Sequence, residues 1–166
     1  MSITSENPAP KRWGILILLL LTVFAISAIG SWITLPKIPT WYASLIKPSF
    51  NPPSWVFGPV WTTLYAAMAV AAWRVWIWPG DGAERQMALA WFWLQLALNA
   101  IWSPIFFGLE RLGLAFGVIL AMVAAIAITT LRFFRIDRLA GWLFVPYLCW
   151  VTFATVLNGA IFWLNP

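Results

Sequence analysis

Five long stretches of the sequence are almost free of charged residues, and they constrain the fold more than any other feature. They cover approximately residues 13–35, 56–78, 87–109, 112–131 and 139–164. A helix that crosses the hydrocarbon core of a bilayer needs about 20 mostly apolar residues. The apolar residues are continuous rather than alternating, which favours helices over the strands of a membrane β-barrel. The sequence therefore predicts an all-α integral membrane protein, a five-transmembrane-helix bundle.

The small number of charged residues excludes several classes of protein. Only 9% of the residues are charged and 63% are hydrophobic, whereas a soluble domain carries about 25% charged residues. So few charges cannot cover a water-facing surface. This excludes a soluble enzyme and, despite the net charge of +5, a soluble nucleic-acid-binding protein. No charged residue lies near the middle of any apolar stretch, which argues against ion-coupled transport and against acid–base catalysis within the membrane.

Histidine and cysteine, which form many metal sites and many catalytic triads, are almost absent from the sequence. The sequence has no histidine, and Cys149 is its only cysteine. Histidine-based triads, histidine metal sites and intrachain disulfides are thereby excluded, and no metal or cofactor is expected. The apolar neighbours of Cys149 predict a buried, unreactive thiol.

The apolar stretches imply a single domain, residues 13–165, after a short polar tail, residues 1–12. The first stretch resembles a secretory signal peptide, but it exceeds the 7–15 residues of a signal's apolar core, which favours a retained helix. The longest connection, at about residues 36–55, contains five prolines and several aromatic residues. Because proline fixes φ and lacks an N–H group, we expect no regular helix there. We interpret this loop as a lid, with an interfacial aromatic belt as the alternative.

Basic residues are distributed unequally between the two ends of the predicted helices. Seven lie in or beside the N-terminus, the second loop (79–84) and the fourth loop (132–138), and three lie at the other end. Cytoplasmic loops of membrane proteins carry the excess of lysine and arginine. We therefore expect the N-terminus and the second and fourth loops in the cytoplasm, with the lid and the C-terminus on the other side.

Three amide side chains are the polar groups at the predicted membrane depth. Gln95 and Asn99 lie four residues apart, and therefore on one face of the third helix. Asn158 shares a face of the fifth helix with Trp150 and Ala154. Each amide is compatible with a hydrogen bond between helices. The alternative is a set of polar groups in an aromatic-lined pocket, which would suit a flat, apolar ring system.

A ridge of small residues follows the fourth helix. Gly113, Gly117, Ala121 and Ala125 are each four residues apart. Such a ridge predicts close helix packing, either within the bundle or between two copies of the chain.

Four motifs occur in order along the lid and the helices. They read Trp41-Tyr42-x-x-Leu45-x-Lys47-Pro48-x-Phe50-x-Pro52-Pro53, then Trp55-Val56-Phe57-Gly58-Pro59-Val60-Trp61-x-x-Leu64-Tyr65, then Leu98-Asn99-x-x-Trp102-Ser103-x-x-Phe106-Phe107, and finally Pro146-Tyr147-Leu148-x-Trp150 with Ala154-Thr155-x-Leu157-Asn158. In these motifs the chain resembles the translocator protein (TspO/MBR) family, the tryptophan-rich sensory proteins once called peripheral-type benzodiazepine receptors. The resemblance covers nearly the whole chain, residues 13–165.

The resemblance implies a compact five-helix bundle that commonly forms a homodimer in the lipid bilayer. It also implies a pocket, open toward the lid, for porphyrins such as protoporphyrin IX, for isoquinoline-carboxamide and benzodiazepine-like ligands and, in animal members, for cholesterol. The ligand-binding residues that it implies are Trp41, Trp61, Asn99, Trp150 and Ala154, with Tyr65, Trp102, Phe106 and Tyr147 as further lining. Lys47 would pair with a porphyrin propionate or, alternatively, extend its ammonium group to the membrane interface.

The sequence departs from animal members near its C-terminus. They carry a tyrosine followed by a basic residue as a proposed cholesterol motif, whereas no tyrosine, lysine or arginine follows Ala154 here. Such motifs are weak even when present. Strong sterol recognition is therefore not expected, and the chain fits a bacterial member located in the cell membrane rather than the outer membrane.

Three functions follow from these patterns. The first is a membrane protein that binds tetrapyrroles and drug-like aromatic ligands as a sensor, a sequestering site or a transporter. The second is a light- and oxygen-dependent porphyrin-degrading enzyme in which Trp61 and Trp150 take part in redox chemistry, although the sequence holds no conventional catalytic constellation. The third is a membrane scaffold that recruits partners through its loops and its small-residue helix.

Overall fold

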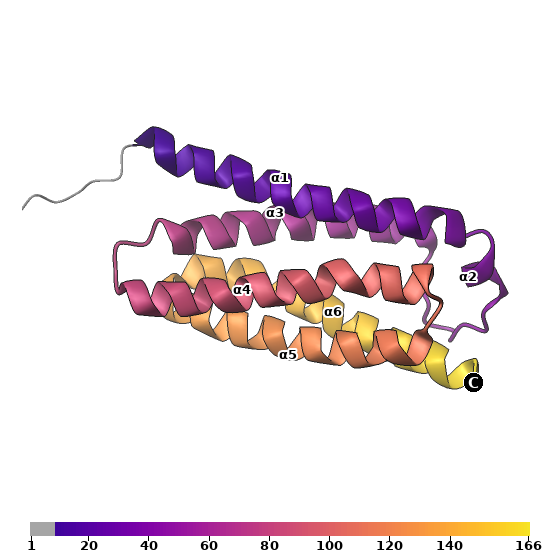
Figure 1. The fold of residues 1–166 in the computed structure, drawn as a ribbon. Coiled ribbons are helices and arrows are strands. Elements are labelled where there is room, and N and C mark those ends of the chain that lie inside the picture. Colours follow the sequence, from indigo (N-terminus) through magenta and orange to yellow (C-terminus); the bar gives the residue numbers. More distant parts are fainter. Residues whose placement is uncertain (1–8) are drawn as a thin grey trace, which may run out of the picture.

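Residues 9–166 are described by a computed structural model, in which five long helices form an elongated bundle (Figure 1). The long helices are α1 (Ala9–Thr34), α3 (Phe57–Trp76), α4 (Gly82–Ser103), α5 (Leu112–Ile136) and α6 (Arg138–Leu164). Within the described range, these five helices are long and apolar enough to cross a membrane, and no strand is present. The prediction of an all-α bundle of five spanning helices is confirmed.

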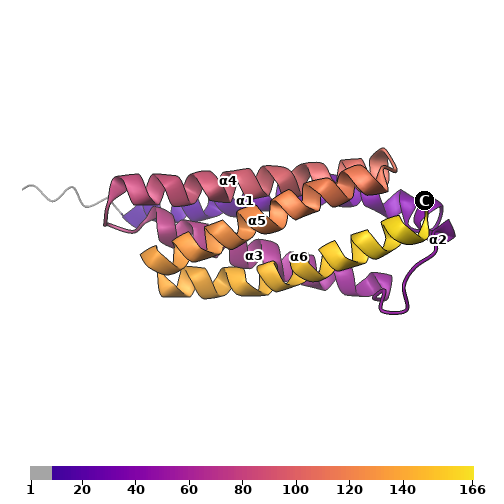
Figure 2. The same ribbon diagram turned by 90° about the horizontal axis from the view of Figure 1, so that it is seen from below.

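The segment predicted as a lid contains only short helical turns. They are η1 (Leu35–Lys37), α2 (Trp41–Ser44) and η2 (Ser54–Val56). Its prolines limit each turn to three or four residues, because they supply no N–H group to a helix interior. The C-terminus lies at the same end of the bundle as this segment, as the two ribbon views show (Figures 1 and 2). We call residues 36–55 the lid.

One predicted loop boundary is wrong. The fourth loop was expected over residues 132–138, but α5 continues to Ile136 and only Asp137 separates it from α6. Arginine is a good helix former and is favourable in a last helical turn, so Arg132 and Arg135 extend α5 rather than end it. At the N-terminal end, α1 begins at Ala9 and its membrane-spanning part begins at Arg12, so the helix includes the last residues of the predicted polar tail. The rest of that tail, residues 1–8, lies outside the described residues.

Asp137 fixes the tight corner between α5 and α6. Its carboxylate accepts a hydrogen bond of 2.8 Å from the Ala140 backbone N–H, which caps the first turn of α6. The same carboxylate binds the Arg74 guanidinium of α3 through two contacts of 3.0 and 2.7 Å. This bidentate pair ties α3 to the corner, and its hydrogen bonds lower the pKa of Asp137.

Helices α5 and α6 pack closely because two phenylalanine rings of α5 lie over two glycines of α6. Phe116 lies over Gly159, where a Cβ atom would come within 2.9 Å of the ring, and Phe134 lies over Gly141 at still closer range. A larger residue at either glycine would therefore push the two helices apart. The helix preceding them, α4, ends in a π-helical turn, η3 (Pro104–Gly108), which leads into α5 through Glu110 and Arg111.

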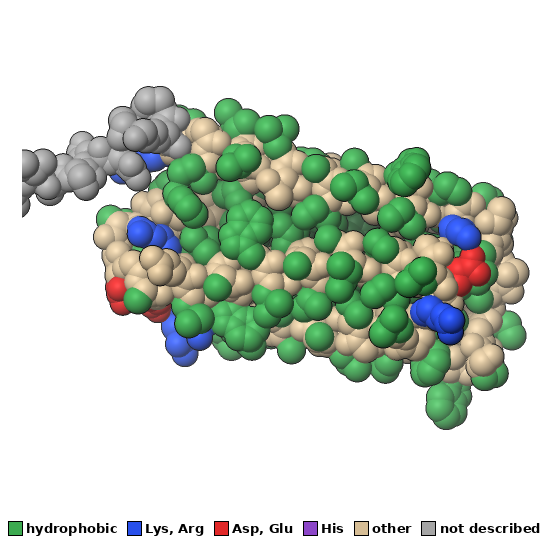
Figure 3. All heavy atoms as spheres, in the orientation of Figure 1, with side chains coloured by type: hydrophobic (Ala, Val, Ile, Leu, Met, Phe, Trp, Pro, Cys, Tyr) green, Lys and Arg blue, Asp and Glu red, His purple; other side chains and the backbone are tan. Residues whose placement is uncertain are grey.

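The outside of the bundle is apolar along its middle and charged at its ends. Figure 3 shows this arrangement on one face, with lysine, arginine and acidic side chains only near the two ends. The surface that a bilayer would contact is therefore apolar. Cys149 lies on this outside surface and is exposed. The prediction of a buried cysteine is wrong, because apolar neighbours in a spanning helix do not distinguish a core position from a lipid-facing one.

Candidate ligand-binding site

A cavity of about 430 Å³ lies between the helices at the lid end of the bundle. Residues of all five long helices line it, and the lid contributes Ile38, Tyr42, Asn51, Pro52, Ser54 and Trp55. Among the residues that the structure describes, none that lines this cavity carries a charge. A concave, mostly apolar space with a few polar groups is the usual form of a small-molecule site.

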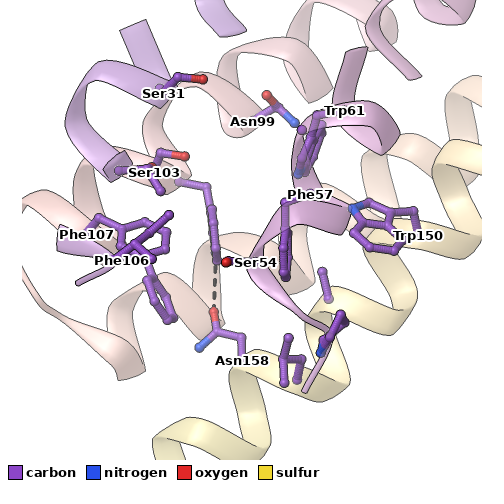
Figure 4. Close-up of a pocket in the computed structure, with 18 of the residues that line it drawn as sticks. Ser31, Ser54, Phe57, Trp61, Asn99, Ser103, Phe106, Phe107, Trp150 and Asn158 are labelled. Carbon is purple, nitrogen blue, oxygen red and sulfur yellow. Dashed lines mark hydrogen bonds between the residues drawn. The ribbon is translucent and has the colours of Figure 1, made fainter. Parts of the chain in front are cut away.

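Aromatic rings form two opposing walls of the cavity (Figure 4). On one side, Phe57 and Trp61 of α3 lie near Trp150 of α6, with the Phe57 and Trp150 ring centres 5.7 Å apart. On the other side, Trp102 of α4 stacks on Phe106 of η3 at 4.9 Å. The indole N–H of Trp150 is buried and has no hydrogen-bond partner in the described part of the chain. An acceptor on a ligand would satisfy this donor.

A chain of hydrogen bonds forms the floor of the cavity. The Tyr65 hydroxyl of α3 donates to Asn99 Oδ1 of α4 at 2.6 Å, and Asn99 Nδ2 donates to the Tyr147 hydroxyl of α6 at 3.1 Å. That hydroxyl in turn donates to Gln95 Oε1 at 2.9 Å. Because the chain joins three helices and is buried, it closes the cavity on the side away from the lid. Gln95 Nε2 is buried without a partner within the described residues.

The third amide, Asn158 of α6, forms hydrogen bonds with both α4 and α5. Its Oδ1 accepts a hydrogen bond of 3.3 Å from the Trp102 indole N–H, the dashed line in Figure 4, and its Nδ2 donates to the Leu112 carbonyl of α5 at 3.2 Å. The bond to Asn158 fixes the orientation of the Trp102 ring in the cavity wall. The three amides therefore make hydrogen bonds between helices and also border the cavity or its floor.

The lid is fastened to the rest of the bundle at two points. Asn165 accepts a hydrogen bond from the Ile46 backbone N–H and donates one to the Ile46 carbonyl, each at 2.9 Å. Lys37 pairs with Glu110 of the α4–α5 connection at 2.7 Å. Between these points, Trp41 packs edge-on against Phe106, with ring centres 5.7 Å apart. These contacts hold the lid over the cavity.

One tyrosine and one lysine side chain complete the lid. The Tyr42 hydroxyl donates to Asn51 Oδ1 at 2.8 Å, and burial raises the pKa of Tyr42, so it remains a neutral donor. The Lys47 ammonium donates to the carbonyls of Ala43 and Leu45, at 3.2 and 3.0 Å, and lies 4.9 Å from the centre of the Tyr42 ring. In this position Lys47 does not line the cavity.

The structure brings most of the predicted site residues together. Seven of the nine line the cavity: Trp61, Tyr65, Asn99, Trp102, Phe106, Trp150 and Ala154. The other two lie behind it. Trp41 supports Phe106 from the lid, and Tyr147 is fully buried in the hydrogen-bonded floor. Sequence reasoning missed the contribution of α1, where Ser27, Gly30, Ser31 and Thr34 face the cavity. Their helical spacing within an otherwise apolar stretch was the available signal.

Comparison with known proteins places the chain in one family. The TspO/MBR family matches residues 17–164. The chain is 46% identical over 129 residues to the tryptophan-rich sensory protein of Cereibacter sphaeroides, covering 78% of this chain and 79% of that protein. It is 44% identical to the translocator protein of Homo sapiens, covering 73% and 72%. It is also 38% identical to the tryptophan-rich protein TspO of Archaeoglobus fulgidus, covering 88% and 94%. The chain therefore belongs to the TspO/MBR family and is a multi-pass membrane protein with five spanning helices.

Proposed function

We propose that this protein binds tetrapyrroles of the protoporphyrin IX type, and drug-like aromatic molecules, in the cavity beneath the lid. The observation that carries the proposal is the pair of opposing aromatic walls, with Phe57, Trp61 and Trp150 on one side and Trp102 and Phe106 on the other. A flat ring system gains contact with both walls at once, because aromatic surfaces attract one another in stacked and edge-to-face arrangements.

The polar groups of the cavity support the same proposal. They are neutral, and the Trp150 indole N–H has no partner in the described residues. Ring nitrogens, carbonyls and amides are acceptors that this donor could bind without any compensating charge. Isoquinoline-carboxamide and benzodiazepine-like ligands share these features with tetrapyrroles, since each combines flat rings with a few neutral acceptors.

The arrangement of the lid supports a role as sensor, sequestering site or transporter. A cavity closed by separable hydrogen bonds at Asn165 and Lys37 holds a ligand and releases it when the lid opens. The names of relatives, tryptophan-rich sensory protein and translocator protein, agree with such a role. We propose that the lid faces away from the cytoplasm, because most basic residues lie at the other end of the bundle.

We also propose that two copies associate through α5. Gly117 and Ala121 of the small-residue ridge are exposed on the outside of the bundle. Apart from the adjoining backbone of α5 and the two chain neighbours of Gly117, no atom of the described residues lies within 4 Å of the position that a Gly117 Cβ would take. The backbone of a second copy can approach closely at this position, as is common in membrane helix pairs.

Quenching of tryptophan fluorescence by protoporphyrin IX, in the dark and in detergent, tests the proposed binding. We expect saturable quenching that is weakened at least several-fold in Trp150→Phe, because phenylalanine lacks the N–H donor and part of the ring. Trp142→Phe is the matched control, since Trp142 is exposed on the outside of α6. Linear quenching that never saturates, identical in all three proteins, would show partition into the micelle and would refute the proposal.

A further inference from the structure

The inward face of α1 changes its chemistry where the helix reaches the cavity. As far as Val23 this face is apolar and packed, with Leu19 and Val23 buried against the other helices. Beyond Val23, the residues of α1 that line the cavity are Ser27, Gly30, Ser31 and Thr34. Their spacing of three and four places them on one stripe of the helix. Within the described residues of α1, no residue that lines the cavity has an apolar side chain. We call Ser27, Ser31 and Thr34 the hydroxyl stripe.

The hydroxyl stripe has no hydrogen-bond partner within the described part of the protein. Hydroxyls in membrane helices usually bond to the carbonyl four residues earlier, as Thr22 of α1 does at 2.8 Å and Thr62 of α3 does at 2.9 Å. Within the described residues, Ser27, Ser31 and Thr34 make no side-chain hydrogen bond. Their donors and acceptors are therefore free to face the cavity.

A fourth hydroxyl from a different helix joins this wall. Ser103 of α4 lines the cavity, and its Oγ would lie 3.6 Å from a Cβ atom at Gly30. Ser103 therefore lies directly beside α1 at Gly30. Figure 4 shows the hydroxyls of Ser31 and Ser103 directed toward the cavity, opposite Phe57, Trp61 and Trp150. The cavity therefore has aromatic walls and, at the contact of α1 with α4, a wall of hydroxyl groups.

We infer that the hydroxyl stripe, with Ser103, binds neutral oxygen groups at one edge of a ligand whose flat body lies between the aromatic walls. This inference rests on the proposed tetrapyrrole function and adds the chemical class of the edge groups: ester, carbonyl, amide, hydroxyl or protonated carboxyl oxygens. Serine and threonine hydroxyls both donate and accept, so they match such groups. No charged residue among those described lines the cavity, so burying an ionised carboxylate there would be costly. The hydroxyls therefore favour neutral oxygen groups over a negatively charged one.

Three porphyrins that share one ring system separate this role from simple packing. Protoporphyrin IX carries two carboxyl groups, its dimethyl ester carries neutral oxygens in their place, and etioporphyrin carries no oxygen. Each is titrated by tryptophan quenching against the wild type and against the double variant Ser27→Ala/Ser31→Ala. Thr22→Val is the matched control, because its hydroxyl lies on α1 but bonds to its own helix. Comparing proteins with the same porphyrin cancels differences in micelle partition.

We expect the dimethyl ester to bind the wild type saturably and to lose about 25-fold in affinity in the double variant, since each of the two lost hydrogen bonds corresponds to about fivefold. Etioporphyrin should bind both proteins equally, and Thr22→Val should behave as wild type. Equal weakening of all three porphyrins, or of none, would overturn the inference, as would an ester that fails to bind where the free acid does. If no porphyrin binds the wild type saturably, the proposed function itself falls, and this inference with it.

Discussion

The hydrogen-bonded chain from Tyr65 to Gln95 divides the bundle into two halves that differ in how closely their side chains pack. In the half away from the lid, the rings of Phe92, Phe133 and Phe144 contact one another and are fully buried. In the lid half, tryptophan, phenylalanine and tyrosine rings line a cavity, and the buried Trp150 indole N–H has no partner within the described residues. The half away from the lid is closely packed, whereas the lid half contains the cavity.

This difference separates stability from binding. Close packing gives one half the density of a protein interior, which holds the helices in register. The lid half gives up part of that packing and leaves aromatic faces and hydroxyls available to a ligand. Substitutions in the two halves should therefore have different consequences, and the predictions below test this division.

The largest effect is expected in the packed half. Phe144→Ala removes a fully buried ring that contacts Phe92, Phe133 and Tyr147. We expect a loss of about 3 kcal/mol in the free energy of unfolding, at the low end for buried phenylalanines because separated helices still lie in apolar surroundings. Unfolding in a denaturing detergent measures it. The folded fraction should keep its porphyrin affinity, and a selective loss of affinity with full stability would contradict the division.

A smaller loss is expected at the boundary between the halves. Tyr147→Phe removes the hydroxyl that accepts from Asn99 and donates to Gln95. Gln95 is then left with both of its polar atoms unpaired in the interior, which costs about 1–3 kcal/mol. The same unfolding assay applies, with Thr129→Val as a control that removes a buried hydroxyl bonded only to its own helix. Equal losses of stability in the two variants would show that the hydrogen bonds between the helices stabilise the bundle no more than a bond within one helix does.

Next in size is an effect on ligand rates rather than on stability. Asn165→Ala removes both hydrogen bonds to Ile46 and with them one fastening of the lid. Two exposed hydrogen bonds amount together to about 1 kcal/mol, so association and dissociation should each accelerate about fivefold, with little change in affinity. Stopped-flow tryptophan quenching measures both rates. The variant Asn165→Asp keeps only the acceptor, so its rates should lie between those of the wild type and Asn165→Ala. Unchanged rates in Asn165→Ala would mean that the lid does not control access to the cavity.

The smallest effect is electrostatic. The Arg74 hydrogen bonds lower the pKa of Asp137, so their stabilisation is present above the usual carboxyl pKa of about 3.9 and is lost as the pH falls through the lowered value. The pair is partly exposed, which limits the gain to below about 1 kcal/mol. Asp137→Asn keeps the helix cap but loses the charge. Thermal unfolding should show the wild type slightly more stable at pH 7 and the difference gone near pH 2; a difference that persists there would refute this assignment.

The sequence allowed the fold to be predicted better than the site. Spanning helices need long apolar stretches, so their number and approximate positions were readable. The end of α5 was not, because Arg132 and Arg135 suit a loop and a final helical turn equally well. In the site, the motifs identified the aromatic walls, but sequence spacing cannot tell that Tyr147 lies behind the cavity or that Trp41 supports Phe106. The hydroxyl stripe was missed because small polar residues in a membrane helix also serve helix packing.

The central claim, that one half is filled and the other is hollow for a ligand, is tested most directly by placing the same extra volume in each half. Ala72→Leu adds it where Ala72 is fully buried in the packed half, and Ala154→Leu adds it in the cavity wall. Unfolding stability and protoporphyrin IX affinity are measured for both. We expect Ala72→Leu to lose about 1–3 kcal/mol of stability through overpacking, and Ala154→Leu to keep its stability while losing at least tenfold in affinity. An Ala154→Leu protein that binds as the wild type does, or that is destabilised as much as Ala72→Leu, would contradict the account.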